Sequence, residues 1–202
     1  MTPFVDVAFL ILSFFIMATK FKPPQPVEIT TPSSVSADKL KEQDAVMIEM
    51  DKRGRVFMTV NTERAEDNEL KKQLIKNVSD ARNLGLTQTE IDNYANNTTI
   101  GVPFNKVKSF LGMDQDGRNR ALEGIPVTDS ADNQLATWVA NAIHTFQGRR
   151  LNFLIKGDND SKYPTFKGII DALRRNEIFK YQLVTDPEGV PVGTDLYKLQ
   201  QQ

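Results

Sequence analysis

The chain has 202 residues, with 25 lysines and arginines against 26 aspartates and glutamates, and a formal net charge of −1. This balance provides no basic field that would favour nucleic acid as a partner. The absence of cysteine excludes disulfides, thiolate metal sites and cysteine nucleophiles, and a single histidine, His144, excludes a metal site built on several histidines. The length accommodates one ordinary domain with an anchor, or two small domains.

The N-terminal segment from Pro3 to Thr19 is apolar except for Asp6, Ser13 and Thr19. As a helix it extends roughly 25 Å, at the short end for crossing a hydrocarbon core. A signal peptide is disfavoured because no lysine or arginine precedes the apolar run. A helix in a globular core is rarely apolar on every face. We therefore predict a transmembrane helix over residues 1–20.

Asp6 is the residue that this helix has to accommodate. An ionised carboxylate at the centre of a membrane helix costs about 2.5–3.5 kcal/mol. Helical spacing places Asp6 on one face with Leu10, Ser13 and Met17. A polar stripe of this kind indicates a partner helix or a water-filled path beside a carboxyl group whose protonation can change. In the alternative, Asp6 lies at the membrane edge, solvated and without a special role.

Residues 21–44 are polar and rich in proline, serine and threonine, which is typical of an extended linker. An alternating stretch within them predicts a strand that pairs with another segment, and a plain spacer is the alternative. The candidate pairing residues are Val27, Glu28, Ile29 and Thr30. Because Lys20 and Lys22 follow the apolar segment, the positive-inside rule alone would place the linker in the cytoplasm.

Residues 45–202 predict a small α+β domain with helices packed on a sheet. Ala45–Met50 and Arg55–Val60 alternate around a glycine-containing turn and predict a hairpin. Thr87 and Glu90 have the spacing of a capping box at a helix start. Helices are predicted over Asp67–Asn83, Pro103–Leu111, Ser130–Gln147 and Tyr163–Asn176, and further strands over Leu151–Lys156 and Tyr181–Thr185. The inward face of the first helix is predicted to carry Leu70, Leu74, Ile75, Val78 and Ala81.

The domain offers little that indicates catalysis. The run from Asp114 to Gly117 lacks the spacing of a calcium loop and is predicted to be a surface turn. Asp158 and Asp160 are predicted to lie in a solvated turn rather than to act as paired catalytic carboxylates. No glycine-rich phosphate loop and no nucleophile elbow occurs in the sequence. A Ser-His-Asp site through His144 remains formally open. The arginine pairs 149–150 and 174–175 are predicted to be solvated charges at helix ends.

Four segments in order resemble the ExbD/TolR family of biopolymer transport proteins. Pro3-Phe4-Val5-Asp6-Val7 is similar to the start of the family's single transmembrane span. The linker sequence VEITTPSSVSA, the hairpin MIEMDKRGRVFM and the stretch from Asn152 to Asp186 are similar to later parts of the family domain. The sequence departs from the family pattern at about residues 84–150, which form an insertion in the 45–202 domain, and only two residues precede Pro3.

The resemblance implies a non-enzymatic motor subunit without a cofactor or metal. It implies an inner-membrane protein with a cytoplasmic N-terminus and a periplasmic domain, against the orientation suggested by the two lysines. Asp6 would be the proton-carrying residue, with Ser13 on the same helix face, and the chain would act as a homodimer. The implied partners are an ExbB/TolQ-like multi-span protein, a TonB/TolA-like protein, and peptidoglycan as a further candidate. A passive membrane anchor that binds peptidoglycan or a partner is the alternative function, and a secreted enzyme is a third.

Overall fold

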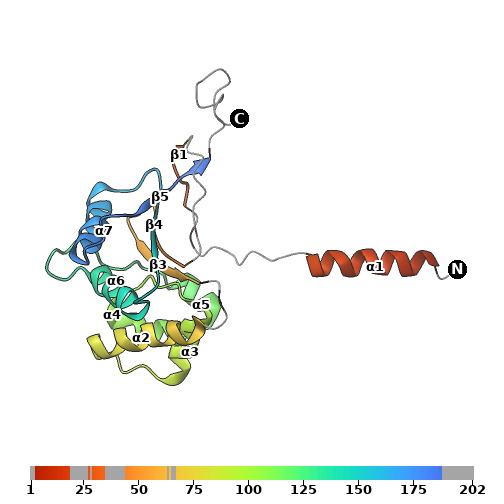
Figure 1. Cartoon of the computed structure of the whole chain (residues 1–202), viewed down its shortest axis with the longest axis horizontal. Helices are drawn as coiled ribbons and strands as arrows, with labels where there is room; N and C mark the ends of the chain where they lie inside the picture. Colours follow the sequence, from red (N-terminus) through yellow and green to blue (C-terminus); the bar gives the residue numbers. More distant parts are fainter. Residues whose placement is uncertain are drawn as a thin grey trace, which may run out of the picture.

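The structure is a computed structural model that describes residues 3–18, 27, 29–34, 44–62, 64 and 67–187. It contains an N-terminal helix, α1 (Pro3–Ala18), and a domain with a mixed sheet and several helices. Figure 1 shows α1 standing apart from this domain. The α+β class predicted from the sequence is confirmed.

The main sheet has four strands in the order β3-β2-β4-β5. The strands are β2 (Ala45–Met50), β3 (Val56–Asn61), β4 (Asn152–Gly157) and β5 (Gln182–Val184). β2 and β3 form the predicted antiparallel hairpin, whereas β2–β4 and β4–β5 pair in parallel. Parallel pairs need a crossover connection. The long segment between β3 and β4 and the helix between β4 and β5 provide these connections.

The hairpin turn is held by one carboxylate. Asp51 accepts hydrogen bonds from the backbone amides of Arg53 and Arg55, and its other oxygen lies 2.7 Å from Arg55 Nη2. Gly54 takes a positive φ of 80°, which favours glycine. The Arg55 side chain also reaches the Leu122 carbonyl oxygen at 2.7 Å. The Arg55 side chain therefore connects the turn to the segment that contains Leu122.

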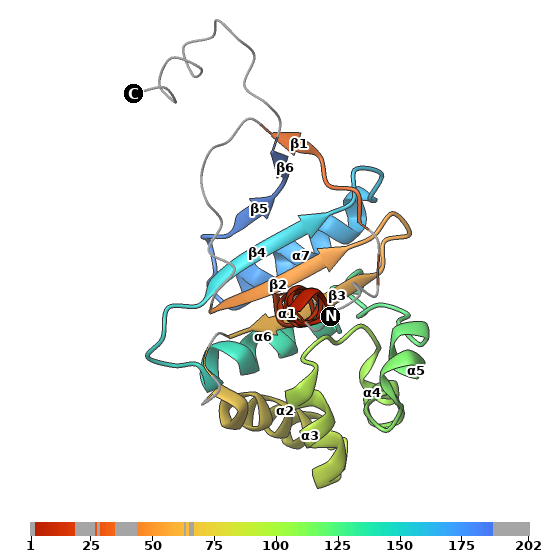
Figure 2. The ribbon, with the colours of Figure 1, turned by 90° about the vertical axis from the view of Figure 1, so that its right-hand side faces the viewer.

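The domain has six helices in its described part: α2 (Asn68–Arg82), α3 (Gln88–Asn96), α4 (Phe104–Leu111), α5 (Gln115–Arg120), α6 (Gln134–Thr145) and α7 (Tyr163–Arg175). Figure 2 shows the sheet in front of α6 and α7, with α2 to α5 gathered beyond the β3 edge. α2 packs on α6, and α3 packs on both α2 and α4. The helices thus lie on one face of the sheet and continue past its edge.

One hydrophobic core extends through the sheet, α6, α7 and the segment 84–150. Alternation places Val46, Ile48 and Met50 of β2 on the helix-covered face, where each is buried. Trp138 of α6 is fully buried, with its ring 6.3 Å from that of Tyr94 and 5.7 Å from that of Phe104. The aromatic side chains of α3 and α4 therefore pack into the same core as the sheet.

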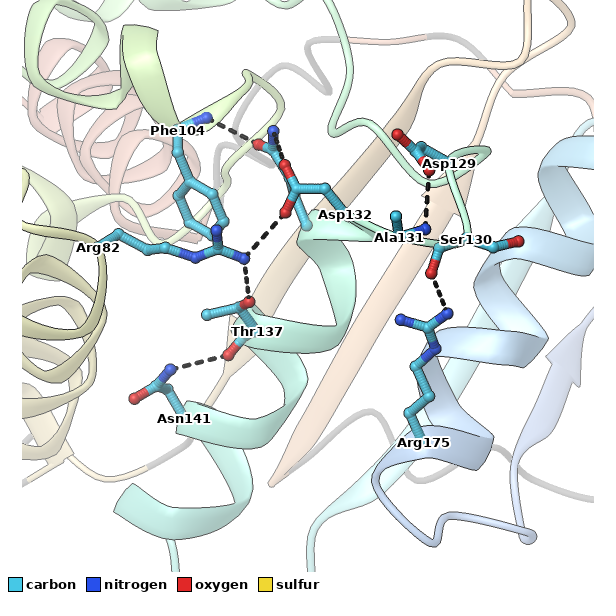
Figure 3. A network of polar contacts seen from close by, with 10 residues as sticks. Arg82, Phe104, Asp129, Ser130, Ala131, Asp132, Thr137, Asn141 and Arg175 are labelled. Atoms are coloured by element: carbon cyan, nitrogen blue, oxygen red, sulfur yellow. Dashed lines mark hydrogen bonds and ion pairs between the residues drawn. The ribbon is translucent and has the colours of Figure 1, made fainter.

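A polar network beside this aromatic cluster joins three helices. Arg82 Nη2 lies 3.2 Å from Asp132 Oδ1 and 2.7 Å from Thr137 Oγ1. The Arg82 guanidinium also lies over the Phe104 ring, 4.5 Å from its centroid. Figure 3 shows the Arg82 side chain from α2 between Phe104 and the start of α6. The positive charge of Arg82 is therefore paired with Asp132 at the point where α2, α4 and α6 meet.

Several local predictions are confirmed and others are corrected. The Thr87 capping box is present, because Thr87 Oγ1 accepts from the Glu90 amide and Glu90 accepts from the Thr87 amide. Ala81 is exposed rather than on the buried face of α2. Asp114 is not in a plain surface turn: its carboxylate accepts from the Gly117 amide and caps α5.

A second, two-stranded sheet joins the linker to the C-terminal part of the domain. β1 (Ser33–Ser34) pairs in parallel with β6 (Asp186–Pro187), with Ser33 opposite Asp186. Figure 2 shows this pair beyond the β5 edge of the main sheet. The linker therefore enters the domain on the side of β4 and β5.

Candidate functional site

α1 carries the residues that the sequence singled out. Pro3 begins the helix, a position that suits proline because its missing amide would have no partner there. Asp6 lies in the first turn and is exposed, and Ser13 is half-buried. Helical geometry places the two about 20° apart around the axis and roughly 10 Å apart along it. The predicted polar face therefore has its two polar side chains on one line.

The described side chains of α1 from Val5 to Phe14 include large apolar ones around the helix. The exposed residues are Val5, Val7, Phe9, Leu10, Ile11, Leu12 and Phe14. Each is more than half exposed, a surface that a protein in water normally buries. No helix in the described part of the chain is long and apolar enough to cross a membrane.

The linker is fixed to the domain at the end of β4. The Thr30 amide donates to Asp158 Oδ2 at 3.1 Å, and the Thr30 carbonyl oxygen accepts from the Asn159 amide at 2.9 Å. Thr31, the next residue, is buried. Two hydrogen bonds and one buried side chain thus hold this part of the linker against the turn between β4 and α7. We call the Thr30–Asp158 contact the linker anchor.

Asp158 was predicted to be a solvated turn residue, and that prediction is wrong. Its side chain is 7% exposed. Oδ1 accepts from the Asp160 amide and Oδ2 from the Thr30 amide, so both oxygens have donors. An aspartate that follows a buried strand and precedes a second turn residue is a known signal for a side chain that bonds to nearby backbone. Only the Thr30 contact, across 128 positions, could not be read from that signal.

The predicted linker strand at residues 27–30 is only partly described. Val27 and Ile29 are half-buried, Val27 packs against the hydrophobic core, and Thr30 makes the anchor contact. Glu28 lies outside the described residues. The described strand of the linker is β1, which begins three residues after Thr30. Strand pairing by Val27, Glu28, Ile29 and Thr30 therefore stays a prediction.

The sheet face opposite α6 and α7 carries a charged pair. Glu49 of β2 lies opposite Lys156 of β4 in the parallel register, with Oε1 3.9 Å from Nζ. Their side chains are 22% and 16% exposed. Burial raises the pKa of Glu49, and the attraction of Lys156 opposes this increase with a smaller effect. Glu49 is therefore a titratable group on the face that the helices leave open.

Two arginines that were predicted to be solvated have specific partners. Arg149 Nη1 lies 2.5 Å from Asp67 Oδ1, and the Asp67 side chain is fully buried. Arg175 donates to the Ser130 carbonyl oxygen. Arg150, Arg174 and Arg175 are exposed, as predicted, whereas Arg149 is partly buried. The position of these arginines near helix ends does not predict their partners, because the partners lie far away in the sequence.

The domain arranges no group with evident catalytic geometry in its described part. His144 is exposed at the last turn of α6. Among the described residues, no group of three or more histidine, aspartate or glutamate side chains could hold a metal ion. The features that bear on function are instead α1, which carries Asp6, and the linker anchor at the end of β4.

The order of these features is that of a known family. The family model for the biopolymer transport protein ExbD/TolR matches residues 1–188, which include α1, the linker, both sheets and every described helix. The chain belongs to the ExbD/TolR family. The matched range includes residues 84–150, and the insertion expected there stays a prediction. No curated protein and no solved structure shows a significant match to the chain.

Membership gives the chain its general role. The ExbD/TolR family serves energy transduction in biopolymer transport and is a non-enzymatic accessory family. Its members in general work with partners of the ExbB/TolQ and TonB/TolA types. The resemblance drawn from the sequence is thereby confirmed.

Proposed function

We propose that this chain is a motor subunit of the inner membrane, driven by the proton-motive force. It works with an ExbB/TolQ-like multi-span protein and energises a TonB/TolA-like protein for transport across the outer membrane. α1 spans the membrane once, with the N-terminus in the cytoplasm and the 45–202 domain in the periplasm, and two copies act together. The observation that carries the proposal is a lone carboxylate, Asp6, on a helix whose large apolar side chains are exposed throughout the described stretch from Val5 to Phe14.

The exposed surface of α1 supports insertion in lipid. Its described 16 residues extend about 24 Å at 1.5 Å per residue. A span shorter than the hydrocarbon core is accommodated by local thinning of the bilayer at a modest cost. In that setting the seven exposed apolar side chains meet lipid or apolar helices of the partner.

Asp6 then becomes the group that responds to protons. A carboxylate inside hydrocarbon costs about 2.5–3.5 kcal/mol when ionised and much less when protonated. Protonation lets α1 move past apolar walls of the partner, and deprotonation holds it at a polar position. Ser13, about two turns beyond Asp6 on the same face, offers a hydroxyl group along this line. One charge moved across 100 mV supplies about 2.3 kcal/mol, so one or two protons can drive a step.

The linker anchor gives this motion a path into the domain. Thr30 is hydrogen-bonded to Asp158 and Asn159 at the end of β4, and β1 is paired with β6. Movement of α1 would therefore pull on the main sheet at β4 and its neighbour β5. The periplasmic partner would receive the motion from this side of the domain.

The test is Asp6→Asn in the chromosomal copy, with Asp80→Asn as the matched control, since Asp80 is an exposed carboxylate on α2. We expect Asp6→Asn to abolish energy-dependent uptake across the outer membrane, because asparagine cannot take up or release a proton. Protein level and co-purification with the multi-span partner should equal those of the control. Uptake at the control level in Asp6→Asn would refute proton coupling through Asp6 and favour a passive anchor.

A further inference from the structure

Two turns of the domain lie side by side at the end of the sheet where the linker is attached. One is the hairpin turn between β2 and β3, and the other is the turn between β4 and α7. The Asp158 amide donates to the Met50 carbonyl oxygen at 2.8 Å, which joins the two turns. A Cβ atom at Gly54 would lie 2.8 Å from Thr165 Oγ1, so the hairpin turn also packs against the start of α7. Figure 2 shows both turns at the same end of the sheet as the linker.

Exposed basic side chains gather on these two turns. Lys52 and Arg53 are exposed in the hairpin turn, and Lys162 is exposed directly before α7. Lys167 is exposed on the second turn of α7. None of the four forms an ion pair within the described part of the chain. We call Lys52, Arg53, Lys162 and Lys167 the basic end.

The carboxylates at this end are mostly buried. Asp51 is 3% exposed and pairs with Arg55. Asp158 is buried, and its two oxygens accept from the Thr30 and Asp160 amides. Within residues 51–55 and 158–167, Asp160 is the one exposed carboxylate. The exposed charges of this end are therefore predominantly positive, and the surface attracts anions within about a Debye length.

Tyr163 adds an aromatic side chain to the basic end. It is the first residue of α7 and is 74% exposed. Tyrosine is enriched at membrane–water interfaces, because its ring is apolar while its hydroxyl group stays hydrated. Lysine and arginine close to an anionic membrane surface are attracted to that surface. An exposed aromatic ring among basic side chains is thus a composition that suits an anionic lipid surface.

The linker keeps this end of the domain close to α1. α1 ends at Ala18, and the linker anchor at Thr30 follows twelve residues later. A fully extended chain covers at most about 3.6 Å per residue, so the anchor lies within about 43 Å of the end of α1. Binding between two groups on a short tether is intramolecular, and a weak attraction is then sufficient. If α1 spans a membrane, the basic end is therefore the part of the domain that the linker holds nearest to it.

We propose that the basic end binds the anionic headgroups of phospholipids at the surface of the membrane that α1 spans. The inference rests on the proposed function in its placement of α1 in the membrane. The four cations pair with lipid phosphate groups, and the Tyr163 ring lies among the headgroups. An acidic segment of a protein partner would also match the cations, but a lipid surface matches the exposed aromatic ring and the short tether as well.

Docking of this kind is peripheral and reversible. Each cation near an anionic surface strengthens attachment by about fivefold, and salt weakens it. Alkaline extraction removes such a contact, so attachment that resists extraction still depends on α1. In the docked state the linker anchor lies near the membrane surface, and docking thereby sets the position from which α1 moves the domain.

The test places one label at the basic end of the full chain, which contains no cysteine of its own. Asn159→Cys, at an exposed side chain of the turn between β4 and α7, carries the fluorophore NBD, and Thr89→Cys in α3 carries the same label as the distant control. The labelled chains are reconstituted in vesicles of phosphatidylcholine alone, or with one third phosphatidylglycerol, that contain a doxyl-lipid quencher. We expect the Asn159→Cys label to be quenched in anionic vesicles at about 0.05 M salt, and to lose this quenching in neutral vesicles or at about 0.5 M salt. The Thr89→Cys label should stay unquenched throughout.

Four charge-removing substitutions test the assigned side chains. Lys52→Gln, Arg53→Gln, Lys162→Gln and Lys167→Gln together should lower the ratio of docked to undocked domain by at least about tenfold. The matched control replaces four exposed cations outside the basic end by glutamine, and should dock as the wild type does: Lys76, Arg150, Arg174 and Lys180. Equal quenching in neutral and anionic vesicles, or unchanged docking in the basic-end variant, would refute the proposal. An unquenched Asn159→Cys label in anionic vesicles would leave these cations to an acidic protein partner and would also refute it.

Flotation of the same vesicles separates this inference from the proposed function. The full chain should float with vesicles of both compositions, because insertion of α1 does not require anionic lipid. A chain that floats while its Asn159→Cys label stays unquenched overturns the docking alone. A chain that fails to float with neutral vesicles contradicts the insertion of α1, and the docking inference is overturned with it.

Discussion

Four acidic side chains of this chain differ in what their surroundings offer a carboxylate. Asp6 lies exposed on an apolar helix, whereas Asp158 is buried and accepts two backbone hydrogen bonds. Asp67 is fully buried with Arg149 as its ionic partner, and its Oδ2 has no donor in the described structure. Glu49 is partly buried beside Lys156. The proposed function uses Asp6, whereas Asp158 and Asp67 serve the fold.

Removal of the Arg149 charge should destabilise the domain. Arg149→Met would retain much of the side-chain volume but leave the buried Asp67 carboxylate without its partner. Breaking a buried pair from one side costs about 3–5 kcal/mol, and we expect about 3 kcal/mol because Arg149 is itself partly exposed. The free energy of unfolding from denaturant titration measures the effect. Arg150→Met, at the exposed neighbour, is the control, and equal loss in the two variants would contradict the assignment.

Glu49 should make stability depend on pH. Burial raises its pKa in the folded chain above the ordinary value of 4.5, so the folded state holds this proton more tightly than the unfolded state. The resulting stabilisation is complete below the unfolded value and is lost as the pH rises through the folded value. Glutamine does not titrate, and Glu49→Gln should therefore gain stability relative to the wild type as the pH rises above about 4.

Urea unfolding midpoints of the wild type and Glu49→Gln, measured from about pH 4 to pH 8, test this dependence. Glu177→Gln, at an exposed glutamate, controls for the change of net charge alone. Parallel profiles for the wild type and Glu49→Gln would show that Lys156 offsets the effect of burial.

Among the elements, the linker has the most direct bearing on the proposed mechanism. A polar, proline-rich segment would by itself be a loose tether. Here Thr30 is bonded to the end of β4 and β1 is paired with β6, so the described part of the linker is integrated with the domain. A linker that is attached to the sheet has a shorter unattached length than a free linker. Movement of α1 therefore reaches the domain with less of it lost in straightening the linker.

Asp158→Ala should release the linker anchor. The Thr30 amide would lose its acceptor, and its hydrogen exchange should accelerate by about tenfold for a hydrogen bond of about 1.4 kcal/mol. Hydrogen-exchange mass spectrometry of peptides that cover residues 27–34 measures this change. Asp160→Ala is the matched control, since Asp160 is exposed and contributes only its amide to the turn. Equal exchange in the two variants would show that Asp158 does not hold the linker.

For the whole molecule, the distribution of apolar surface separates α1 from the domain. The domain buries its large apolar residues in one core, apart from a few such as Phe179 and Leu183 near β5. In the described part of α1, seven large apolar side chains are exposed. A surface of this kind is stable in lipid or against a partner, and this contrast is the physical basis for the proposal that α1 lies in the membrane.

Membrane attachment should depend on α1 alone. Phe9→Lys with Leu12→Lys would place two charges in the middle of the helix, each at a cost of about 2.5–3.5 kcal/mol in hydrocarbon. We expect this variant to be released by alkaline extraction of membranes while the wild type is retained. Phe179→Lys with Leu183→Lys makes the same chemical changes on exposed residues of the domain and should remain attached. Release of the control, or retention of the α1 variant, would contradict a membrane role for α1.

The sequence alone determined the features that depend on local order. The hairpin, the Thr87 cap, α4 and the βαβ unit around α7 follow from alternation, helical spacing and turn residues within a few positions of one another. The apolar helix with Asp6 is equally local, and together with the ordered motifs it identified the family.

Only the tertiary structure decided the contacts between distant positions. Thr30 meets Asp158, Arg149 meets Asp67, and Asn133 meets Gly168 because the sheet order and helix packing bring these residues together. A hydrophobic pattern specifies which face of an element is buried, but not which distant polar group will lie opposite it. The burial of Asp158 could for this reason not be predicted from the sequence.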